Sequence, residues 1–461
     1  MQRSSFSGSV GFVLAAAGSA VGLGNIWRFP YLAAKDGGGL FLVIYIILAL
    51  TFGFALLTTE IAIGRKTRKG PLSAYRRINP RFKNLGLIGC IIPMMILPYY
   101  SVIGGWVMKF ATAYLFGSGV ETAQEGYFTN FITHKYESII FTVAFLLLTS
   151  FIIYRGVNKG IEKFSKILMP MLLLLIISIS VFSLTIQHTD SLGETRSGLD
   201  GMKIYVIPDF KDLTLEKFSV TLMDAIGQLF YSLSIAMGIM ISYGSYVKDE
   251  NDLVKSINRI EIFDTAVAFL AGAMVIPVVY VFAGYEGMTA SGPGLVFVNI
   301  PKIFAETGQI GNLLGAVFFT MVLFAALTSA ISILEAIVSS FMDKFGYSRK
   351  KSVVIETLIA LFFAILVCLG YNALYFELPL PNGTNAQILD LMDYISNNIL
   401  MPITALLTCI LIGYIAGPEK IISEVTRNGE IFSREKLYRV MIKYIAPLLL
   451  FLLLLKSIGL L

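Results

Sequence analysis

The chain has 461 residues, of which 56% are hydrophobic and only 14% are charged. That balance is typical of an integral membrane protein and excludes an ordinary soluble domain. The formal net charge of +6 comes largely from short loops between apolar segments. We therefore interpret the charge as a membrane-topology signal and not as a nucleic-acid footprint.

Hydrophobic segments make up most of the chain. A helix that crosses a bilayer needs roughly 20 apolar residues, and eleven segments reach or approach that length. The sequence therefore predicts an all-α integral membrane protein with eleven transmembrane helices. The predicted spans are 10–34, 39–63, 86–115, 138–154, 161–186, 218–246, 253–284, 311–342, 352–372, 387–415 and 440–459.

The first segment carries two glycines and two polar residues near its middle. Gly22 and Gly24 each weaken a helix by roughly 1 kcal/mol relative to alanine. A membrane tolerates a broken helix only where protein or a water-lined cavity covers the freed backbone groups. Asn25 and Arg28 follow at a depth where ionisable groups are usually functional. We predict a binding site here; the alternative is a kinked helix whose arginine reaches the interface.

Basic residues cluster after the second, fourth and eighth segments. Because cytoplasmic loops carry the excess of lysine and arginine, this pattern predicts a cytoplasmic N-terminus and an extracellular C-terminus in a multi-pass protein of the cell membrane. No low-complexity linker divides the chain, so we expect one transmembrane domain over residues 1–461.

The sixth segment repeats the features of the first. Small residues and hydroxyls again interrupt it between Gly227 and Gly238, five segments later. Paired interruptions at corresponding places in two halves are a sequence signal for a transporter site. Since five is an odd number, the halves must have inverted topology. The predicted repeats cover about 8–186 and 218–415, and the helix at 440–459 lies outside them.

Six motifs are specific when they are taken together. They are Gly18 to Pro30, Gly37 to Gly39, Tyr99-Tyr100, Asn158 to Lys163, Gln228 to Gly238 and Ala325 to Ser329. Together they resemble the neurotransmitter:sodium symporter family, specifically its bacterial amino-acid transporters. The resemblance implies the LeuT fold, a 5+5 inverted repeat in which helices 1 and 6 are discontinuous, and sodium-coupled import of an amino acid by alternating access.

The resemblance also implies two Na⁺ sites. Sodium is a hard cation, and the carbonyls of broken helices supply oxygen ligands without added charge. The hydroxyls of Thr328 and Ser329, which belong to the second site, could instead donate to carbonyls of their own helix. By position, the first site would use Ala20, Asn25, Ser232, Asp264 and the carboxylate of the substrate, and the second Gly18, Val21, Ala325, Thr328 and Ser329.

A zwitterionic amino acid suits the remaining groups. Its carboxylate would meet the free N–H groups and the helix dipole near Leu23 and Gly24. Methionine at 237 and serine at 19 are smaller than the residues of the leucine-transporting relative, which favours a larger, hydrophobic or aromatic substrate. The alternative is that the pocket closes in on a smaller amino acid. The implied substrate residues are Ser19, Ala20, Leu23, Gly24, Ile96, Tyr100, Tyr231, Ser232, Ser234, Met237, Ser329 and Ile333, although Ile96 and Ile333 could simply pack between helices.

Gates are implied on both sides of this site. Tyr100 and Tyr231 would form an aromatic lid. Arg28 would pair with Asp393 on the outside, and Arg3 with Asp343 on the inside, above Tyr246 and Glu335. Arg3 could instead only set the topology. Glu60 is another carboxylate within a span, and we interpret it as a buried structural partner for backbone or water.

The aspartate at position 264 predicts that transport does not need chloride. Chloride-dependent members of the family carry asparagine here, and a fixed carboxylate would replace the anion. A protonated Asp264 could also neutralise the empty carrier and give proton counter-movement. A purely structural aspartate is the alternative.

Other classes of protein fit less well. A proton-coupled transporter of the same fold would not need the hydroxyl pair Thr328 and Ser329, and a channel would not need two opposed gates. Two isolated histidines and three cysteines within apolar segments offer no metal set and no nucleophile–base pair, so we do not expect an enzyme. The expected partners are a small amino acid and the lipid bilayer, with no nucleic acid and with a monomer sufficient for transport.

Overall fold

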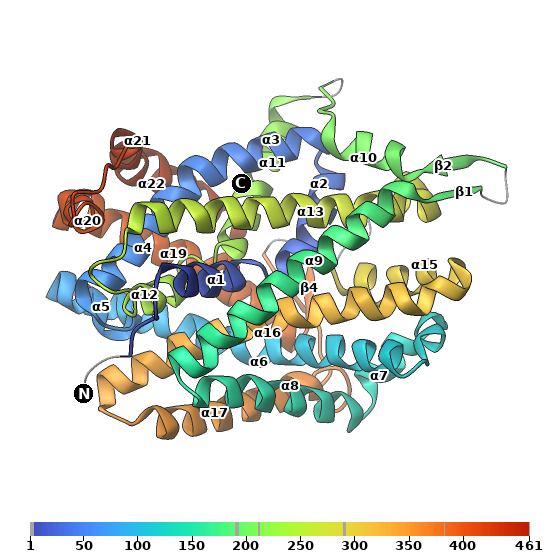
Figure 1. Ribbon diagram of the computed structural model, residues 1–461, viewed down its shortest axis with the longest axis horizontal. Coiled ribbons are helices and arrows are strands. Elements are labelled where there is room, and N and C mark those ends of the chain that lie inside the picture. The colour runs from blue at the N-terminus through green and yellow to red at the C-terminus, as the bar shows by residue number, and fades with distance from the viewer. Residues whose placement is uncertain (1–3, 190–192, 211–212, 289–291, 382, 461) are drawn as a thin grey trace.

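The computed structural model describes residues 4–189, 193–210, 213–288, 292–381 and 383–460, which form a bundle of long helices (Figure 1). The helices are α1 Ser9–Ala20, α2 Phe29–Lys35, α3 Gly39–Leu48, α4 Phe54–Thr67, α5 Pro71–Ile78, α6 Lys83–Leu115, α7 Tyr127–Thr133, α8 Glu137–Tyr154, α9 Lys163–Thr185, α10 Gly198–Val206, α11 Leu215–Ser232, α12 Ile239–Gly244, α13 Leu253–Met288, α14 Gly292–Gly294, α15 Ile300–Glu306, α16 Gly311–Phe345, α17 Arg349–Leu369, α18 Ile388–Asp393, α19 Met401–Ile410, α20 Glu419–Val425, α21 Glu435–Val440 and α22 Ala446–Ser457.

Short helical turns of other kinds and two small hairpins complete the described part of the chain. The hairpins are antiparallel: β1 Gln187–Thr189 pairs with β2 Thr195–Ser197, and β3 Leu378–Pro379 pairs with β4 Asn385–Ala386. Turns of π-helix span Gly24–Arg28, Ala49–Gly53, Val157–Glu162, Leu295–Asn299, Tyr394–Leu400, Leu411–Ala416 and Met441–Ile445, and 3₁₀ turns span Pro80–Phe82, Gly119–Ala123 and Gly308–Ile310.

Nine helices in the described part of the chain are long and apolar enough to cross a membrane. A tenth span is the broken pair Ser9–Ala20 and Gly24–Lys35, whose halves meet at 53°. The predicted sixth segment is divided between α11 and α12. α11 is as long as α8 but carries Glu216, Lys217 and Asp224, and α12 has only 6 residues, so neither is among the nine. The predicted count of eleven therefore depends on treating α11 and α12 as one crossing.

The two breaks face each other because of close packing at glycine. A Cβ added to Gly24 would lie 2.4 Å from Cδ1 of Tyr231, so only glycine lets the first break approach α11 this closely. The second break lies just beyond Tyr231. There Ser234, Ala236 and Gly238 have positive φ values of 52°, 66° and 73°, which a continuous helix does not permit.

Glu60 of α4 supports the second break. Its Oε1 accepts a hydrogen bond of 2.7 Å from the backbone N–H of Ala236, a donor that the unwinding leaves without a helical partner. The carboxylate is buried, with 2% of its surface exposed. The contact matches the structural role that the sequence indicates for this residue.

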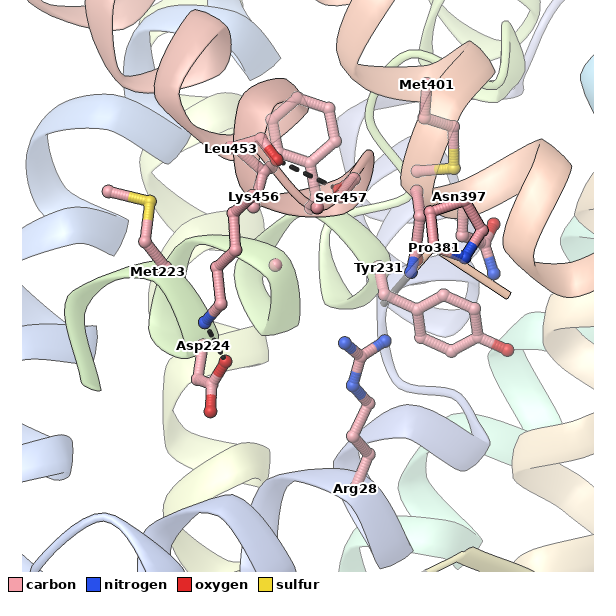
Figure 2. Close-up of a pocket in the computed structure, with 14 residues that line it drawn as sticks. Arg28, Met223, Asp224, Tyr231, Pro381, Asn397, Met401, Leu453, Lys456 and Ser457 are labelled. Atoms are coloured by element: carbon pink, nitrogen blue, oxygen red, sulfur yellow. Dashed lines mark hydrogen bonds and ion pairs between the residues drawn. The ribbon is translucent and has the colours of Figure 1, made fainter. Parts of the chain in front are cut away.

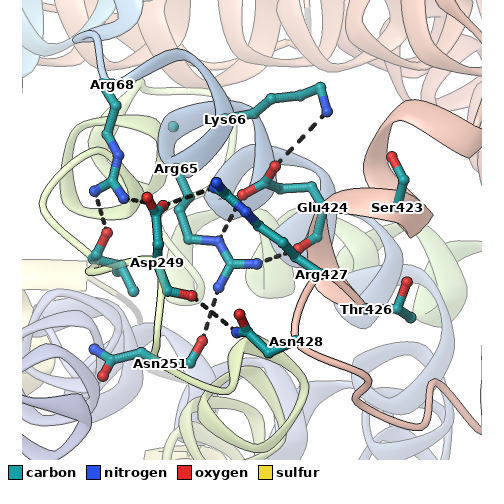
Figure 3. A network of polar contacts seen from close by, with 12 residues as sticks. Arg65, Lys66, Arg68, Asp249, Asn251, Ser423, Glu424, Thr426, Arg427 and Asn428 are labelled. Carbon is teal, nitrogen blue, oxygen red and sulfur yellow. Dashed lines mark hydrogen bonds and ion pairs between the residues drawn. The ribbon is translucent and has the colours of Figure 1, made fainter.

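At the C-terminal end of α4, a buried ion pair joins this helix to α20. The Arg65 guanidinium is buried and lies 2.8 Å from Oε1 of Glu424, and it also donates to the carbonyl oxygen of Asn251 at 2.8 Å (Figure 3). Asp249 accepts from Arg68 and Arg427 beside it. Three segments far apart in sequence are thereby joined at one end of the bundle.

Candidate functional site

A small cavity lies between the two helix breaks. Its lining combines polar groups, namely serine hydroxyls, Asn25 and the Tyr100 hydroxyl, with Met237 and aliphatic side chains. The space between them is about 20 Å³, which is room for about one water molecule. The lining residues are Ser19, Ala20, Gly22, Gly24, Asn25, Ile96, Tyr100, Tyr231, Ser234, Met237, Ser329 and Ile333.

Ten of the twelve residues that the resemblance implies for substrate line this cavity. Leu23 and Ser232 are the two that do not; both are fully buried beside it. Gly22 and Asn25 line the cavity in addition. The sequence analysis did not include Gly22 in the site, although a Cβ there would lie 2.7 Å from Oγ of Ser329.

A buried cluster of oxygen atoms lies behind the cavity, at the first predicted sodium site. Oδ1 of Asp264 accepts from Ser232 Oγ at 2.7 Å and from Asn25 Nδ2 at 3.0 Å. The Tyr45 hydroxyl lies 3.3 Å from Ser232 Oγ and 3.4 Å from the other carboxylate oxygen. The structure thus brings together the three predicted side chains and adds Tyr45, which the sequence analysis missed.

The residues of the second predicted sodium site also lie close together. The Thr328 hydroxyl donates to the carbonyls of Phe324 and Ala325, each at 3.0 Å. A Cβ added to Gly18 would lie 3.3 Å from Cβ of Thr328, which places the first helix against α16 at this point. Ser329 Oγ donates to the Ser19 carbonyl at 3.2 Å. The donor set is neutral oxygen, which is chemically suited to sodium.

A larger cavity of about 370 Å³ lies on the side predicted to be extracellular. Its walls come from α11, α19 and α22 and include Arg28 (Figure 2). Tyr231 lines both this cavity and the small one, so its ring separates them. This position is the one expected for a lid.

The expected ion pair between Arg28 and Asp393 is not formed in this structure, since no pair of their charged atoms lies within 4.0 Å. Asp393 instead accepts a hydrogen bond of 2.6 Å from Asn397 Nδ2. Arg28 lines the larger cavity beside Tyr231, where its guanidinium meets open space (Figure 2). Arg28 therefore lines the larger cavity, whereas Asp393 is bonded to Asn397, which lines the same cavity.

On the opposite side, polar contacts close the bundle. The Tyr246 hydroxyl donates to Glu335 Oε1 at 2.5 Å, so this predicted pair is in contact. Arg349, which the sequence analysis counted only as a topology signal, binds both oxygens of the same carboxylate at 2.5 and 2.8 Å. Asp343 accepts from the Gly70 N–H at 2.6 Å, whereas Arg3 lies outside the described residues.

A second charged cluster joins three helices at the edge of the larger cavity. Asp224 of α11 accepts from Lys35 at 2.8 Å. It also accepts from Lys456 of α22 at 2.9 Å (Figure 2). Asp36 lies 3.8 Å from Lys35 with 4% of its surface exposed. Burial, and next the nearby charge of Asp224, raise the pKa of Asp36 from an ordinary value of 3.8 to about 6.

Protonation of Asp36 should therefore be visible in stability. The folded state binds this proton more tightly than the unfolded state, so proton binding stabilises the fold. This stabilisation is complete below about pH 4 and is lost as the pH rises through about 6. We expect Asp36→Asn to match the wild type at or below about pH 4 and to melt higher at pH 7, by roughly 1–2 °C. Thermal unfolding of the purified protein between these pH values measures the difference. The exposed Glu121→Gln is the matched control, and an Asp36→Asn effect that is equal at both pH values would contradict the assignment.

A bundle that crosses a membrane many times, with two broken helices that enclose one central cavity, defines a membrane transporter. Its fold is the LeuT fold: the structure superposes on that of MhsT in complex with L-phenylalanine with a TM-score of 0.85 and 31% identity, over 99% of this chain and 100% of the other. The chain belongs to the sodium:neurotransmitter symporter family, whose sequence model matches residues 3–123 and 131–460.

Relatives from distant organisms cover nearly the whole chain. An uncharacterized sodium-dependent transporter of Bacillus subtilis, YhdH, is 33% identical over 99% of this chain and 98% of its own. The uncharacterized sodium-dependent transporter MJ1319 of Methanocaldococcus jannaschii is 32% identical over 94% of this chain and 86% of its own. The chain is therefore a multi-pass, sodium-dependent membrane transporter and not an enzyme.

Proposed function

We propose that the protein imports a hydrophobic or aromatic L-amino acid together with sodium, by alternating access and without chloride. The observation that carries the proposal is the cavity between the helix breaks, whose lining is partly polar and partly apolar. Its polar groups suit an amino group and a carboxylate, and its apolar groups suit a hydrocarbon side chain. The structural neighbour MhsT has been solved with L-phenylalanine, a ligand of this class.

The proposed carboxylate position lies beside Tyr100. Its buried hydroxyl has no hydrogen-bond partner among the described residues, so it has a donor to offer. The half-helix that begins near Gly24 presents free N–H groups and the positive end of its dipole to the same space. The amino group would meet the Ala20 carbonyl and the Ser234 hydroxyl, since both residues also line the cavity.

We propose two sodium ions as co-substrates, one at each oxygen cluster. The first cluster is centred on Asp264 and the second on Thr328 and Ser329. Two positive charges that move through about 100 mV release roughly 4–5 kcal/mol. At about 1.4 kcal/mol per tenfold, this supports roughly thousandfold accumulation of a neutral zwitterion.

Alternating access follows from the unequal barriers on the two sides. The larger cavity reaches the Tyr231 ring, so one aromatic layer separates it from the proposed substrate position. Towards the other side lie the Tyr246–Glu335–Arg349 contacts and then Asp343. We propose that Tyr231 and the Arg28–Asp393 pair close over the bound substrate, after which the inner contacts separate. In this proposal the N-terminus is cytoplasmic, the C-terminus is extracellular, the two repeats rock within one domain, and a monomer suffices.

Met237, an apolar residue that lines the cavity, gives a direct test of substrate class. In proteoliposomes, tyrosine, tryptophan, phenylalanine and leucine should compete best for sodium-driven uptake. Met237→Phe replaces a flexible side chain with a rigid ring, so tryptophan should lose about tenfold relative to leucine. The control is Met171→Phe, a lipid-facing methionine of α9 that is 46% exposed. Stronger competition by glutamate or lysine than by these four would contradict the proposal, and uptake driven by a proton gradient alone would favour the proton-coupled alternative.

A further inference from the structure

A third cavity lies on the outer surface of the bundle, between α8 and α17 and far from the proposed transport path. It measures about 310 Å³. The two helices run side by side along the lower edge of Figure 1 and both are membrane spans. The walls are apolar and face outward: Leu147, Phe151, Val354 and Leu358 are 51–61% exposed. This groove therefore faces the lipid phase.

The floor of the groove has no free polar group to attract a polar ligand. Ser150 Oγ and Thr357 Oγ1 lie 2.7 Å apart and hydrogen-bond to each other. Thr357 also lies 2.7 Å from the carbonyl of Val353 one turn earlier. None of the described residues that line the groove carries a charge. Its chemistry suits a hydrocarbon chain.

One end of the groove carries positive charge. Lys350 Nζ lies 5.1 Å from the ring centre of Tyr154, which lines the groove, and the Arg155 guanidinium lies 4.7 Å from the ring centre of Phe151. Both cations are exposed on the side that we propose to be cytoplasmic. Aromatic rings hold them at the rim, where the headgroups of that leaflet lie.

We propose that the groove between α8 and α17 binds an anionic phospholipid of the cytoplasmic leaflet, with an acyl chain between the helices and the phosphate at Arg155 and Lys350. A second copy of the chain fits less well. In a two-fold contact across the groove, each basic rim would face the same rim of its partner and repel it. The concave apolar groove with a cationic end matches one lipid of opposite charge.

The test is lipid retention by the purified full-length protein. Stripped protein is incubated with equal amounts of phosphatidylglycerol and phosphatidylcholine with identical chains, and the lipid that stays bound is measured by native mass spectrometry. The wild type should retain phosphatidylglycerol preferentially. Arg155→Gln with Lys350→Gln should lower that retention by roughly fivefold for each cation removed and leave phosphatidylcholine unchanged. Val354→Trp, which fills the groove, should lower the retention of both lipids.

Matched controls separate the groove from the general surface. Lys436→Gln removes an exposed cation on α21, and Val181→Trp enlarges a side chain of α9 that is 58% exposed. Both should behave like the wild type, and thermal unfolding checks that every variant is folded. Equal retention of the two lipids by the wild type, or unchanged retention in both groove variants, would overturn the proposal. A Val354→Trp variant that changes only the oligomeric state would assign the groove to a second copy.

Discussion

Asp264→Asn should lose sodium-driven uptake in chloride-free medium by at least about tenfold, whereas the wild type should transport equally well with chloride or gluconate. The reason is that Asp264 supplies a fixed negative charge beside the first proposed sodium. Its carboxylate accepts from Ser232 at 2.7 Å and from Asn25 at 3.0 Å, and it is fully buried. Removing one partner of a buried charge pair costs roughly 3–5 kcal/mol, so asparagine should bind the cation poorly. The measurement is initial uptake of labelled substrate into proteoliposomes.

The same variant distinguishes charge replacement from a structural role. Asparagine keeps the size of the side chain and one oxygen acceptor, so the contacts of Asp264 with Ser232 and Asn25 can persist. If the lost charge is the cause, added chloride should restore part of the uptake. Glu356→Gln is the control, since Glu356 is also a buried carboxylate but belongs to α17 and lies outside both sodium clusters. A wild type that stalls in gluconate would contradict charge replacement and leave the symporter assignment in place.

The fold and most of the cavity could be predicted from the sequence because broken helices leave a composition signal. Glycines and hydroxyls in the middle of an apolar segment predicted the two breaks, and the structure places both at one cavity. The position of Glu60 also follows from this logic, since a carboxylate within the membrane needs a donor and an unwound backbone supplies one.

What the sequence analysis missed depends on contacts between distant segments. Tyr45 belongs to α3, whose other residues are all apolar, and only the packing of α3 against α11 brings its hydroxyl to Ser232. Arg349 belongs to a basic loop that already had an explanation as a topology signal, which hid its pairing with Glu335. The Arg28–Asp393 pair stays a prediction for another conformation. In this structure Arg28 lines the larger cavity and Asp393 accepts from Asn397.

Thr328→Val combined with Ser329→Ala should abolish sodium-stimulated uptake with little loss of folding. The two hydroxyls are the side-chain oxygens proposed for the second sodium site. Their present hydrogen bonds are to carbonyls: Thr328 donates within its own helix at 3.0 Å, and Ser329 donates to Ser19 at 3.2 Å. Each such bond contributes only about 1 kcal/mol net, so a large helical bundle should stay folded. The lost ligands, in contrast, cannot be replaced by valine and alanine.

Binding can be measured without transport. Sodium that binds only the folded protein raises its melting temperature as the ion concentration increases, so the wild type should show a sodium-dependent shift and the double variant a smaller one. Thr112→Val with Ser178→Ala is the matched control, because both hydroxyls also donate to backbone carbonyls, here those of their own helices at 2.8 Å, and lie away from the cavity. Full sodium-driven uptake by Thr328→Val with Ser329→Ala would show that these hydroxyls are not ligands of the second sodium. Loss of uptake with an unchanged sodium shift would show that they act in the transport movement and not in ion binding.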